Sequence, residues 1–239
     1  MTEPKLTLHW LNQSRAQRVV WLLEELGLDY EIKPYKRDAE IRAPKELADV
    51  HSLGKSPVLE IEYPDGARKT VAESGHIVSF LMRNFDKNNV FKPTSEQEFD
   101  DVEYYSLMSE GTLQPALSFI VVLRRGGEKA PWAMKSVIRT YNDKVMEAFN
   151  FPETLKCFDL LEKRLVEKSK VSTELYIAGE RLSSADILLS FPVVEQVVFG
   201  DKLGSAFNKE EYPQLVTWAK QIRARPAYIR AQEKTKKFG

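Results

Sequence analysis

Apolar positions in the first ninety residues follow two spacings in turn. Leu6 to Trp10 alternates in the manner of a half-buried strand. Ser14 to Leu26 predicts an amphipathic helix that ends before Gly27, with four apolar side chains on one face: Ala16, Val19, Val20 and Leu23. The same criteria predict strands over 30–34, 57–61 and 68–72, and helices over 45–50 and 74–85.

The order of these elements predicts a mixed four-stranded sheet. A β-α-β unit with a right-handed crossover is followed by a β-hairpin, signalled by Pro64-Asp65-Gly66, and then by a helix. This order resembles the thioredoxin arrangement.

Beyond residue 88 the pattern changes to long helical periods with almost no strand signal. Helices are expected over 96–110, 113–124, 132–149, 154–169, 184–199 and 213–225. Gly126-Gly127 predicts a break, and residues 233–239 predict a frayed basic tail. The fold class is therefore α/β plus all-α, with a thioredoxin-like domain over 1–88 and a helical bundle domain over 96–239.

Composition narrows the function classes. Among 239 residues, 35 Lys and Arg balance 35 Asp and Glu, so nucleic-acid binding is not expected. We find no run of 18 apolar residues and no apolar leader, so neither a transmembrane segment nor a signal peptide is expected. The single cysteine, Cys157, suits a reducing cytosol, and three scattered histidines predict no metal site.

Three short segments carry candidate chemistry, and each has a plainer structural interpretation. Ser14 opens a helix, where free N–H groups stabilise an anion or a thiolate. However, Ser14-Arg15-Ala16-Gln17 also fits a capping box, which is favoured when the segment is taken alone.

The other two segments flank the predicted hairpin. Gly54-Lys55-Ser56-Pro57 precedes a strand, and a cis Pro57 would leave the Ser56 backbone free to pair with an extended peptide, although base rates favour a trans bond. Glu73-Ser74 begins a helix and suits an α-amino acid head group, although Ser74 as a plain N-cap is favoured in isolation. Jointly, the three segments place an anion site, a peptide site and an amino-acid site on ends of one sheet.

An aromatic and apolar stripe lies in the first long helices of the second half. Most such stripes are core, and a minority line an apolar ligand pocket; this one comprises Tyr104, Tyr105, Met108, Leu113 and Phe119. Separately, Ser183-Ser184-Ala185-Asp186 predicts a structural helix cap.

Four motifs in order resemble the soluble glutathione transferases, most closely a fungal, serine-type member. They are the first-helix run 14–31, the loop Leu53-Gly54-Lys55-Ser56-Pro57-Val58-Leu59, the run Ala72-Glu73-Ser74-Gly75-His76-Ile77, and Leu182-Ser183-Ser184-Ala185-Asp186-Ile187. His51-Ser52 departs from the Asn-Pro of many members.

The resemblance implies roles for individual residues. Ser14 would activate the thiol of glutathione, the co-substrate, and no metal would be needed. Six residues would bind glutathione, namely Arg15, Lys55, Ser56, Pro57, Glu73 and Ser74. Tyr105, Met108 and Leu113 would line the pocket for a hydrophobic electrophile. A cytoplasmic homodimer is implied, with peripheral membrane association open.

The expected activity is conjugation of the glutathione thiolate to apolar electrophiles in detoxification. Three alternatives remain open. They are a glutathione-dependent peroxidase, a non-catalytic interaction module of the same fold, and a membrane-inserting relative, against which the lack of a long apolar segment speaks.

Overall fold

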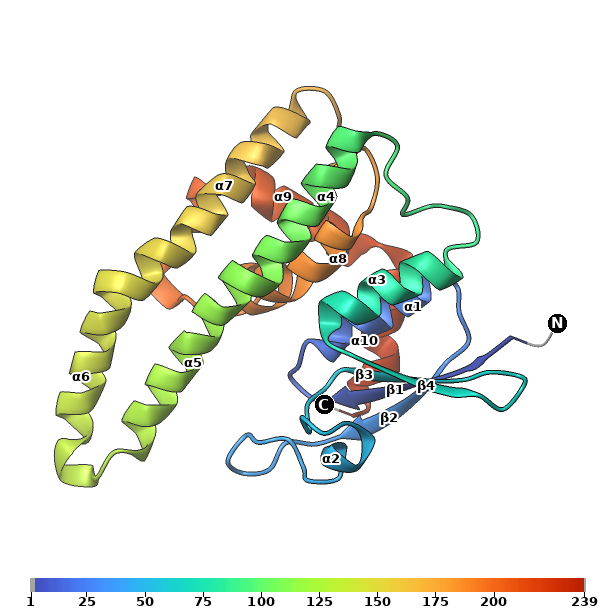
Figure 1. Ribbon diagram of the computed structural model, residues 1–239. Helices are drawn as coiled ribbons and strands as arrows, with labels where there is room; N and C mark the ends of the chain where they lie inside the picture. The colour runs from blue at the N-terminus through green and yellow to red at the C-terminus, as the bar shows by residue number, and fades with distance from the viewer. Residues whose placement is uncertain (1–2, 239) are drawn as a thin grey trace.

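A computed structural model describes residues 3–238 and contains one mixed sheet near the N-terminus (Figure 1). Its strands are β1 (Lys5–Leu11), β2 (Glu31–Tyr35), β3 (Val58–Glu62) and β4 (Arg68–Ala72), in the order β2-β1-β3-β4. The pair β1–β2 is parallel, and β1–β3 and β3–β4 are antiparallel. The predicted mixed sheet is confirmed.

Two helices pack between this sheet and the second half of the chain. They are α1 (Ala16–Glu25) and α3 (Ser74–Phe85), while α2 (Leu47–Val50) is a short helix in the loop before β3. Both α1 and α3 contact α8 (Ser184–Leu189) of the helical half as well as each other. Because α1 has apolar partners on both sides, Val19, Val20, Leu22 and Leu23 are all fully buried. Gly27 ends its last turn with a φ of +63°, a value that glycine adopts without strain.

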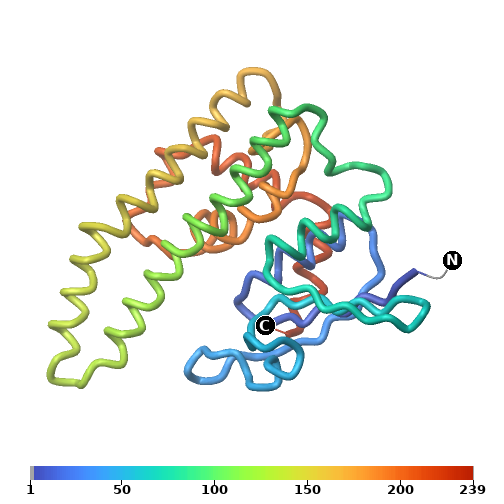
Figure 2. Tube along the Cα trace, viewed as in Figure 1, coloured from blue at the N-terminus to red at the C-terminus, as the bar shows by residue number. Residues whose placement is uncertain are grey.

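The helical half is built on two long antiparallel rods that lie side by side (Figures 1 and 2). The first comprises α4 (Glu96–Met108), the π-helical turn η1 (Ser109–Leu113) and α5 (Gln114–Lys129). The second comprises η2 (Trp132–Met134), α6 (Lys135–Val145), η3 (Met146–Asn150) and α7 (Phe151–Ser169). The rest are α8 (Ser184–Leu189), η4 (Ser190–Val198), η5 (Gly204–Ala206), η6 (Lys209–Glu211), α9 (Pro213–Ala224) and α10 (Pro226–Lys236).

Several predicted helix ends are wrong. The chain stays helical from residue 96 to residue 129, so the breaks expected after residue 110 and at Gly126-Gly127 do not occur. Gly127 is buried beside Arg139, and a Cβ built at Gly127 would lie 3.1 Å from that side chain. This glycine therefore permits close packing of α5 on α6 rather than a chain break.

The C-terminal tail is also corrected. Residues through Lys236 form α10, which packs along α1, and Thr235 is 5% exposed. Glu24 of α1 is 2.9 Å from Arg230 and 2.5 Å from Lys234. Lys234, one of the basic residues of the predicted frayed tail, instead attaches the helix to the first domain together with Arg230.

The predicted cap of α8 is confirmed as a capping box. Asp186 accepts hydrogen bonds from the backbone N–H and the hydroxyl of Ser183, at 3.0 and 2.8 Å. It also accepts from the Ile177 N–H and the Trp218 indole N–H. Burial raises the pKa of this fully buried carboxyl, and the four donors counter that shift.

A connector joins the two halves of the chain. The helix α3 ends at Phe85 and α4 begins at Glu96, so the expected boundaries 1–88 and 96–239 remain predictions on either side of that connector. Residues 1, 2 and 239 lie outside the described residues.

One described helix meets the length and composition of a membrane span. The run Glu96–Lys129 contains an 18-residue window with mean hydropathy 1.2, of which 33% is buried. Core helices of folded domains meet the same criteria, and this helix packs against α6, α7 and α8.

Candidate functional site

The sheet register brings the three candidate segments to one edge. His9 near the end of β1 pairs with Val58 at the start of β3, and Val58 pairs with Ala72 at the end of β4. Ser14, Ser56-Pro57 and Glu73-Ser74 follow or precede these positions by a few residues. They therefore share one edge of the sheet, as the sequence indicated.

Ser14 is 8% exposed, and its hydroxyl is already hydrogen-bonded. It donates to the Leu11 carbonyl at 2.7 Å and accepts from the Ala16 N–H at 3.2 Å. The predicted capping box does not form. Arg15 occupies the N-cap position, and the Gln17 side chain contacts Trp10 and the Ala231 carbonyl.

Hydrogen bonds of the Ser56 hydroxyl link the segment before β3 to β1. The Ser56–Pro57 peptide bond is cis. The Ser56 hydroxyl donates to the His9 carbonyl at 2.8 Å and accepts from the Leu11 N–H at 3.1 Å. Among the described residues, no hydrogen bond engages the Ser56 backbone N–H or C=O. A bound peptide can therefore pair with them.

The start of α3 has an unusual backbone and an unsatisfied hydroxyl. Glu73 has a φ of +67°, is the N-cap, and accepts the first helical hydrogen bond from the Ile77 N–H. Ser74 is the first helical residue rather than the N-cap, so the plainer interpretation of this segment is wrong. The Ser74 hydroxyl is buried and has no partner among the described residues. A buried unsatisfied hydroxyl beside a helix N-terminus is suited to a carboxylate.

A cavity of about 1010 Å³ lies between the two halves of the chain beside Ser14. Ser14, Arg15, Lys55 and Ser56 line it from the first domain, together with the loop after β2. The helix α5 and the end of η4 line it from the second. Neither Pro57 nor the Glu73-Ser74 pair lines this cavity.

A partly buried ion-pair network joins the domains next to this cavity. Glu110 of η1 lies 3.0 Å from the Arg15 guanidinium and 2.6 Å from that of Arg18. Arg18 is fully buried and donates to the Leu188 carbonyl at 2.5 Å. Burial lowers the pKa of Arg18 to about 10, although the Glu110 charge opposes the shift. Neither side chain was expected at the site, because their pairing depends on contacts between distant segments.

The three residues expected to line the electrophile pocket lie in the core. Tyr105 and Met108 are each 7% exposed and Leu113 is fully buried, and none lines the cavity. The π-helical turn η1 explains the difference. It spaces Met108 and Leu113 five residues apart on one buried face, which continues to Leu117 and Ile120.

The helix α5 therefore turns a different face to the cavity. Phe191 and Gln196 of η4 line the cavity together with six residues of α5, which are Gln114, Ser118, Val121, Val122, Arg124 and Arg125. Phe119, which a regular helix would place on the buried stripe, is 46% exposed.

A smaller cavity of about 360 Å³ lies on the other side of Ser14, against α10. It shares Gln13, Ser14, Phe191 and Glu195 with the larger one. Glu195 accepts hydrogen bonds from Tyr228 and Gln232, and burial raises its pKa. Ser14 thus stands between two hollows.

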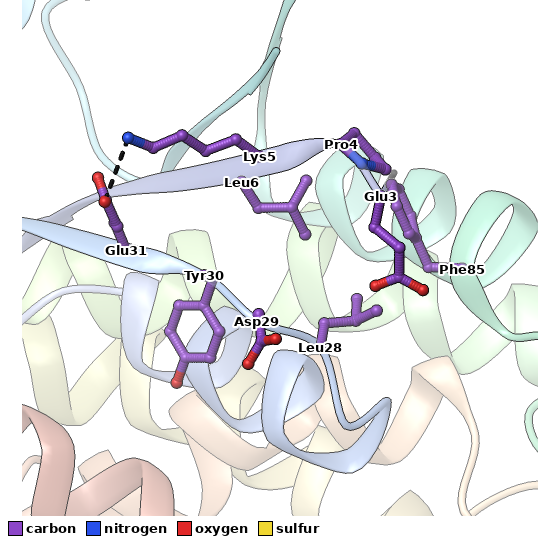
Figure 3. Close-up of a pocket in the computed structure, with 9 residues that line it drawn as sticks. All are labelled: Glu3, Pro4, Lys5, Leu6, Leu28, Asp29, Tyr30, Glu31 and Phe85. Carbon is purple, nitrogen blue, oxygen red and sulfur yellow. Dashed lines mark ion pairs between the residues drawn. The ribbon is translucent and has the colours of Figure 1, made fainter. Parts of the chain in front are cut away.

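A third cavity, of about 490 Å³, lies away from these segments, beside the start of β1 and the end of α3 (Figure 3). Lys5 and Glu31 form an ion pair across neighbouring strands there. It contains none of the expected site residues. Within residues 3–238 no three His, Cys, Asp or Glu side chains form a group that could hold a metal ion.

The fold and the site together define a class of protein. An N-terminal thioredoxin-like domain brings three candidate segments to one edge of its sheet, and a cavity of about 1010 Å³ lies between this domain and an all-helical domain. The sequence matches the glutathione S-transferase N-terminal domain over residues 5–83 and the C-terminal domain over residues 116–226. The chain belongs to the glutathione S-transferase family.

Individual relatives agree with this assignment. The chain is 36% identical over 241 residues to glutathione S-transferase 1 of Saccharomyces cerevisiae, covering 100% of this chain and 99% of that protein. A glutathione S-transferase structure from Actinobacillus pleuropneumoniae is 32% identical with a TM-score of 0.72, covering 97% and 93% of the two chains. Ure2p5 of Phanerochaete chrysosporium, cocrystallized with 1-(S-glutathionyl)-2,4-dinitrobenzene, shares the fold at 18% identity and a TM-score of 0.74, covering 99% and 97%.

Proposed function

We propose that this glutathione transferase uses Ser14 to stabilise the glutathione thiolate, which then attacks an apolar electrophile held against α5 and η4. One observation carries the proposal. A single sheet edge presents the Ser14 hydroxyl, the unengaged Ser56 backbone and the buried, unpartnered Ser74 hydroxyl. These three groups match a thiol, a peptide backbone and an α-amino acid head.

Glutathione would lie across this edge with its γ-glutamyl end at α3. The Ser74 hydroxyl and the first N–H groups of α3 would bind the α-carboxylate, and the exposed Glu73 carboxylate would pair with the ammonium group. The cysteinyl backbone would pair with Ser56 ahead of Pro57. Lys55 and Arg15 supply positive charge for the glycine carboxylate.

The Ser14 hydroxyl must turn from its present partner to act on sulfur. Its proton now points to the Leu11 carbonyl, 2.7 Å away. Rotation about the Cα–Cβ bond would redirect it to the thiolate, which also benefits from the positive end of α1. The thiol proton leaves to solvent. The sulfur then bonds to the electrophilic carbon, and a leaving group such as chloride departs with its electron pair.

The Ser14→Ala variant tests this role. Loss of one hydrogen bond to a charged sulfur, about 1.5–3 kcal/mol, predicts roughly a tenfold or greater loss of kcat/KM with 1-chloro-2,4-dinitrobenzene. The pKa of bound glutathione, measured from thiolate absorbance against pH, should rise. Ser118→Ala, which removes another hydroxyl from the same cavity, is the matched control. An unchanged pH profile in Ser14→Ala would show that another group activates the thiol.

We also propose that the protein is a cytoplasmic homodimer. A groove of about 920 Å³ between α3 and α4 has a mixed lining in which several side chains are apolar, including Met82, Phe91 and Val102. Phe99 and Leu107 on its rim are 55% and 66% exposed. An apolar face of this kind supports a contact with a second copy of the chain. Membership of a family of soluble, usually cytosolic proteins supports the location.

A further inference from the structure

The wall of the large cavity that belongs to the helical domain is positively charged. Arg124 and Arg125 near the end of α5 line it, and Lys202, just after η4, lines it beside them. The acidic side chains in the whole lining are Glu195 and Asp201. The first domain adds three more cations, which are Arg15, Arg37 and Lys55.

Two cations of the first-domain wall have partners within the protein. Arg15 pairs with Glu110, and the Arg37 guanidinium donates to the Asn12 and Ile41 carbonyls. Among the described residues, Arg124, Arg125 and Lys202 form no ion pair with a carboxylate. Two carboxylates lie on the same wall, Glu195 and Asp201. Neither forms an ion pair with these cations, and Glu195 accepts hydrogen bonds from Tyr228 and Gln232 instead.

The surroundings of Lys202 disfavour its charged form. Burial lowers the pKa of its ammonium group, and the neighbouring Arg124 charge lowers it further. A like-charge pair in a partly dry cavity is unfavourable on its own, and an anion between the two groups would relieve it.

An apolar strip separates these cations from the reacting centre. Val121 and Val122 lie one turn before Arg125 on α5, and Phe191 lies beside Ser14 where the two hollows meet. Ile41 and Ala43 face them from the loop after β2. A ligand along this strip is apolar in its middle and meets positive charge at its far end.

We propose that the preferred electrophile carries a carboxylate at the end remote from its reactive carbon, and that Arg124, Arg125 and Lys202 bind this carboxylate. The inference rests on the proposed function and names its substrate class. In the proposed function, the first domain binds the carboxylates of glutathione itself, at Ser74 and near Lys55. The helical wall thus selects the second substrate.

An unsaturated ketone with a distant carboxylate illustrates the reaction. The thiolate sulfur bonds to the β-carbon, and the π electron pair of the C=C bond moves through the carbonyl to give an enolate. Water then protonates the α-carbon. The carboxylate takes no part in bond making, so it contributes to binding and orientation alone.

Ethacrynic acid and its methyl ester provide a matched pair of probes, since both carry the same enone and differ in a remote carboxylate. The measurement is kcat/KM for each, divided by the uncatalysed rate with glutathione. We expect the wild type to favour the acid by roughly tenfold, the equivalent of one charge-assisted interaction of about 1.4 kcal/mol. Raising the salt concentration should reduce that preference.

The triple variant Arg124→Gln/Arg125→Gln/Lys202→Gln should bring the acid-to-ester ratio close to one. Lys163→Gln/Lys220→Gln removes two exposed charges on α7 and α9, outside the cavity, and should keep the wild-type ratio. If the triple variant does not fold, the wild-type ratio and its salt dependence decide the matter.

The outcomes separate this inference from the proposed function. Wild-type protein that turns over neutral 1-chloro-2,4-dinitrobenzene but shows no preference for the acid overturns the carboxylate site alone. Wild-type protein that turns over neither class of electrophile overturns the proposed function. A triple variant that loses acid and ester turnover equally also contradicts the assignment of these cations.

Discussion

Single residues at this site are held by contacts that link the two domains. Glu110 is the clearest case, because its one carboxylate pairs with both Arg15 at the cavity and the fully buried Arg18. The Arg18 side chain is 1% exposed, so bulk solvent does not reach it to replace a lost partner. Its positive charge is therefore tolerable only while Glu110 stays ionised and in place.

Replacing Glu110 tests this dependence. Glu110→Gln leaves the buried guanidinium without its counter-charge, so we expect the free energy of unfolding to fall by about 3 kcal/mol. Urea denaturation followed by fluorescence measures the loss. Glu153→Gln, which breaks an exposed pair with Lys156, is the control and should change little. Equal stability of the two variants would mean that Arg18 finds another partner.

The positions of the candidate residues were predictable from the sequence, but their hydrogen bonds were not. Ser14, Ser56 and Ser74 stand next to strand ends, and the register could be anticipated from the order of the elements. The partners of these hydroxyls depend on the folded backbone, since Ser14 bonds to Leu11 and Ser56 bonds across to β1. Glu110 lies far from Arg18 in sequence, and no local pattern links them.

The first and last residues of a helix or strand were predictable where a tight turn lies at its end. The strand β4 and the helix α3 have the predicted bounds, because Pro64-Asp65-Gly66 and the Glu73-Ser74 start delimit them. In the helical domain, π-helical turns change the phase of the apolar pattern without any breaking residue. The break predicted at Gly126-Gly127 does not form for a related reason, since glycine there serves helix packing.

The helix α10 depends on ion pairs that the sequence did not suggest. Burial alone would raise the pKa of Glu24, but hydrogen bonds from Lys234, Tyr30 and Arg230 lower it below its usual value. A carboxyl with a lowered pKa in the folded state contributes stability above its unfolded pKa and loses it as pH falls through the folded value.

The Glu24→Gln variant tests this attachment. At pH 7 it should be less stable than wild type by about 2 kcal/mol, because charge-assisted hydrogen bonds to α10 are lost. The difference should begin to shrink as the pH falls below the ordinary carboxyl pKa of 4.5, and it should vanish once the pH is below the lowered pKa of the folded wild-type carboxyl. Urea midpoints of both proteins from pH 7 to pH 3 give the comparison. If the stability difference between the two proteins does not depend on pH, the substitution acts through something other than the loss of the carboxylate charge.

At the scale of the whole molecule, the groove between α3 and α4 exposes apolar side chains that no other part of the described chain covers. The groove between α3 and α4 combines residues of both domains, so its shape exists only when the domains are docked as they are here. Sequence patterns gave the apolar residues of α4 but not their exposure. That exposure follows from α8 covering one face of α4 while the other stays open.

Light scattering tests the proposed dimer. We expect a mass of twice the 27.5 kDa of the chain, and Leu107→Glu should shift the population toward single chains, because it places a charge in the groove. Val171→Glu, at an 84% exposed position after α7, provides the control and should leave the mass unchanged. A single-chain mass for the wild type would contradict the dimer.

The π-helical turn η1 bears on how this protein can change in length. A π turn accommodates one additional residue while the helices on either side keep their facing directions. A Cβ built at Gly111 would have no neighbours within 4 Å. Deleting Gly111 should therefore yield an uninterrupted α-helix in which α4 and α5 keep the same residues buried and the same residues exposed. A deletion in the middle of α5 would instead rotate every later side chain by roughly 100°. Insertions and deletions among related chains are thus expected to concentrate at η1.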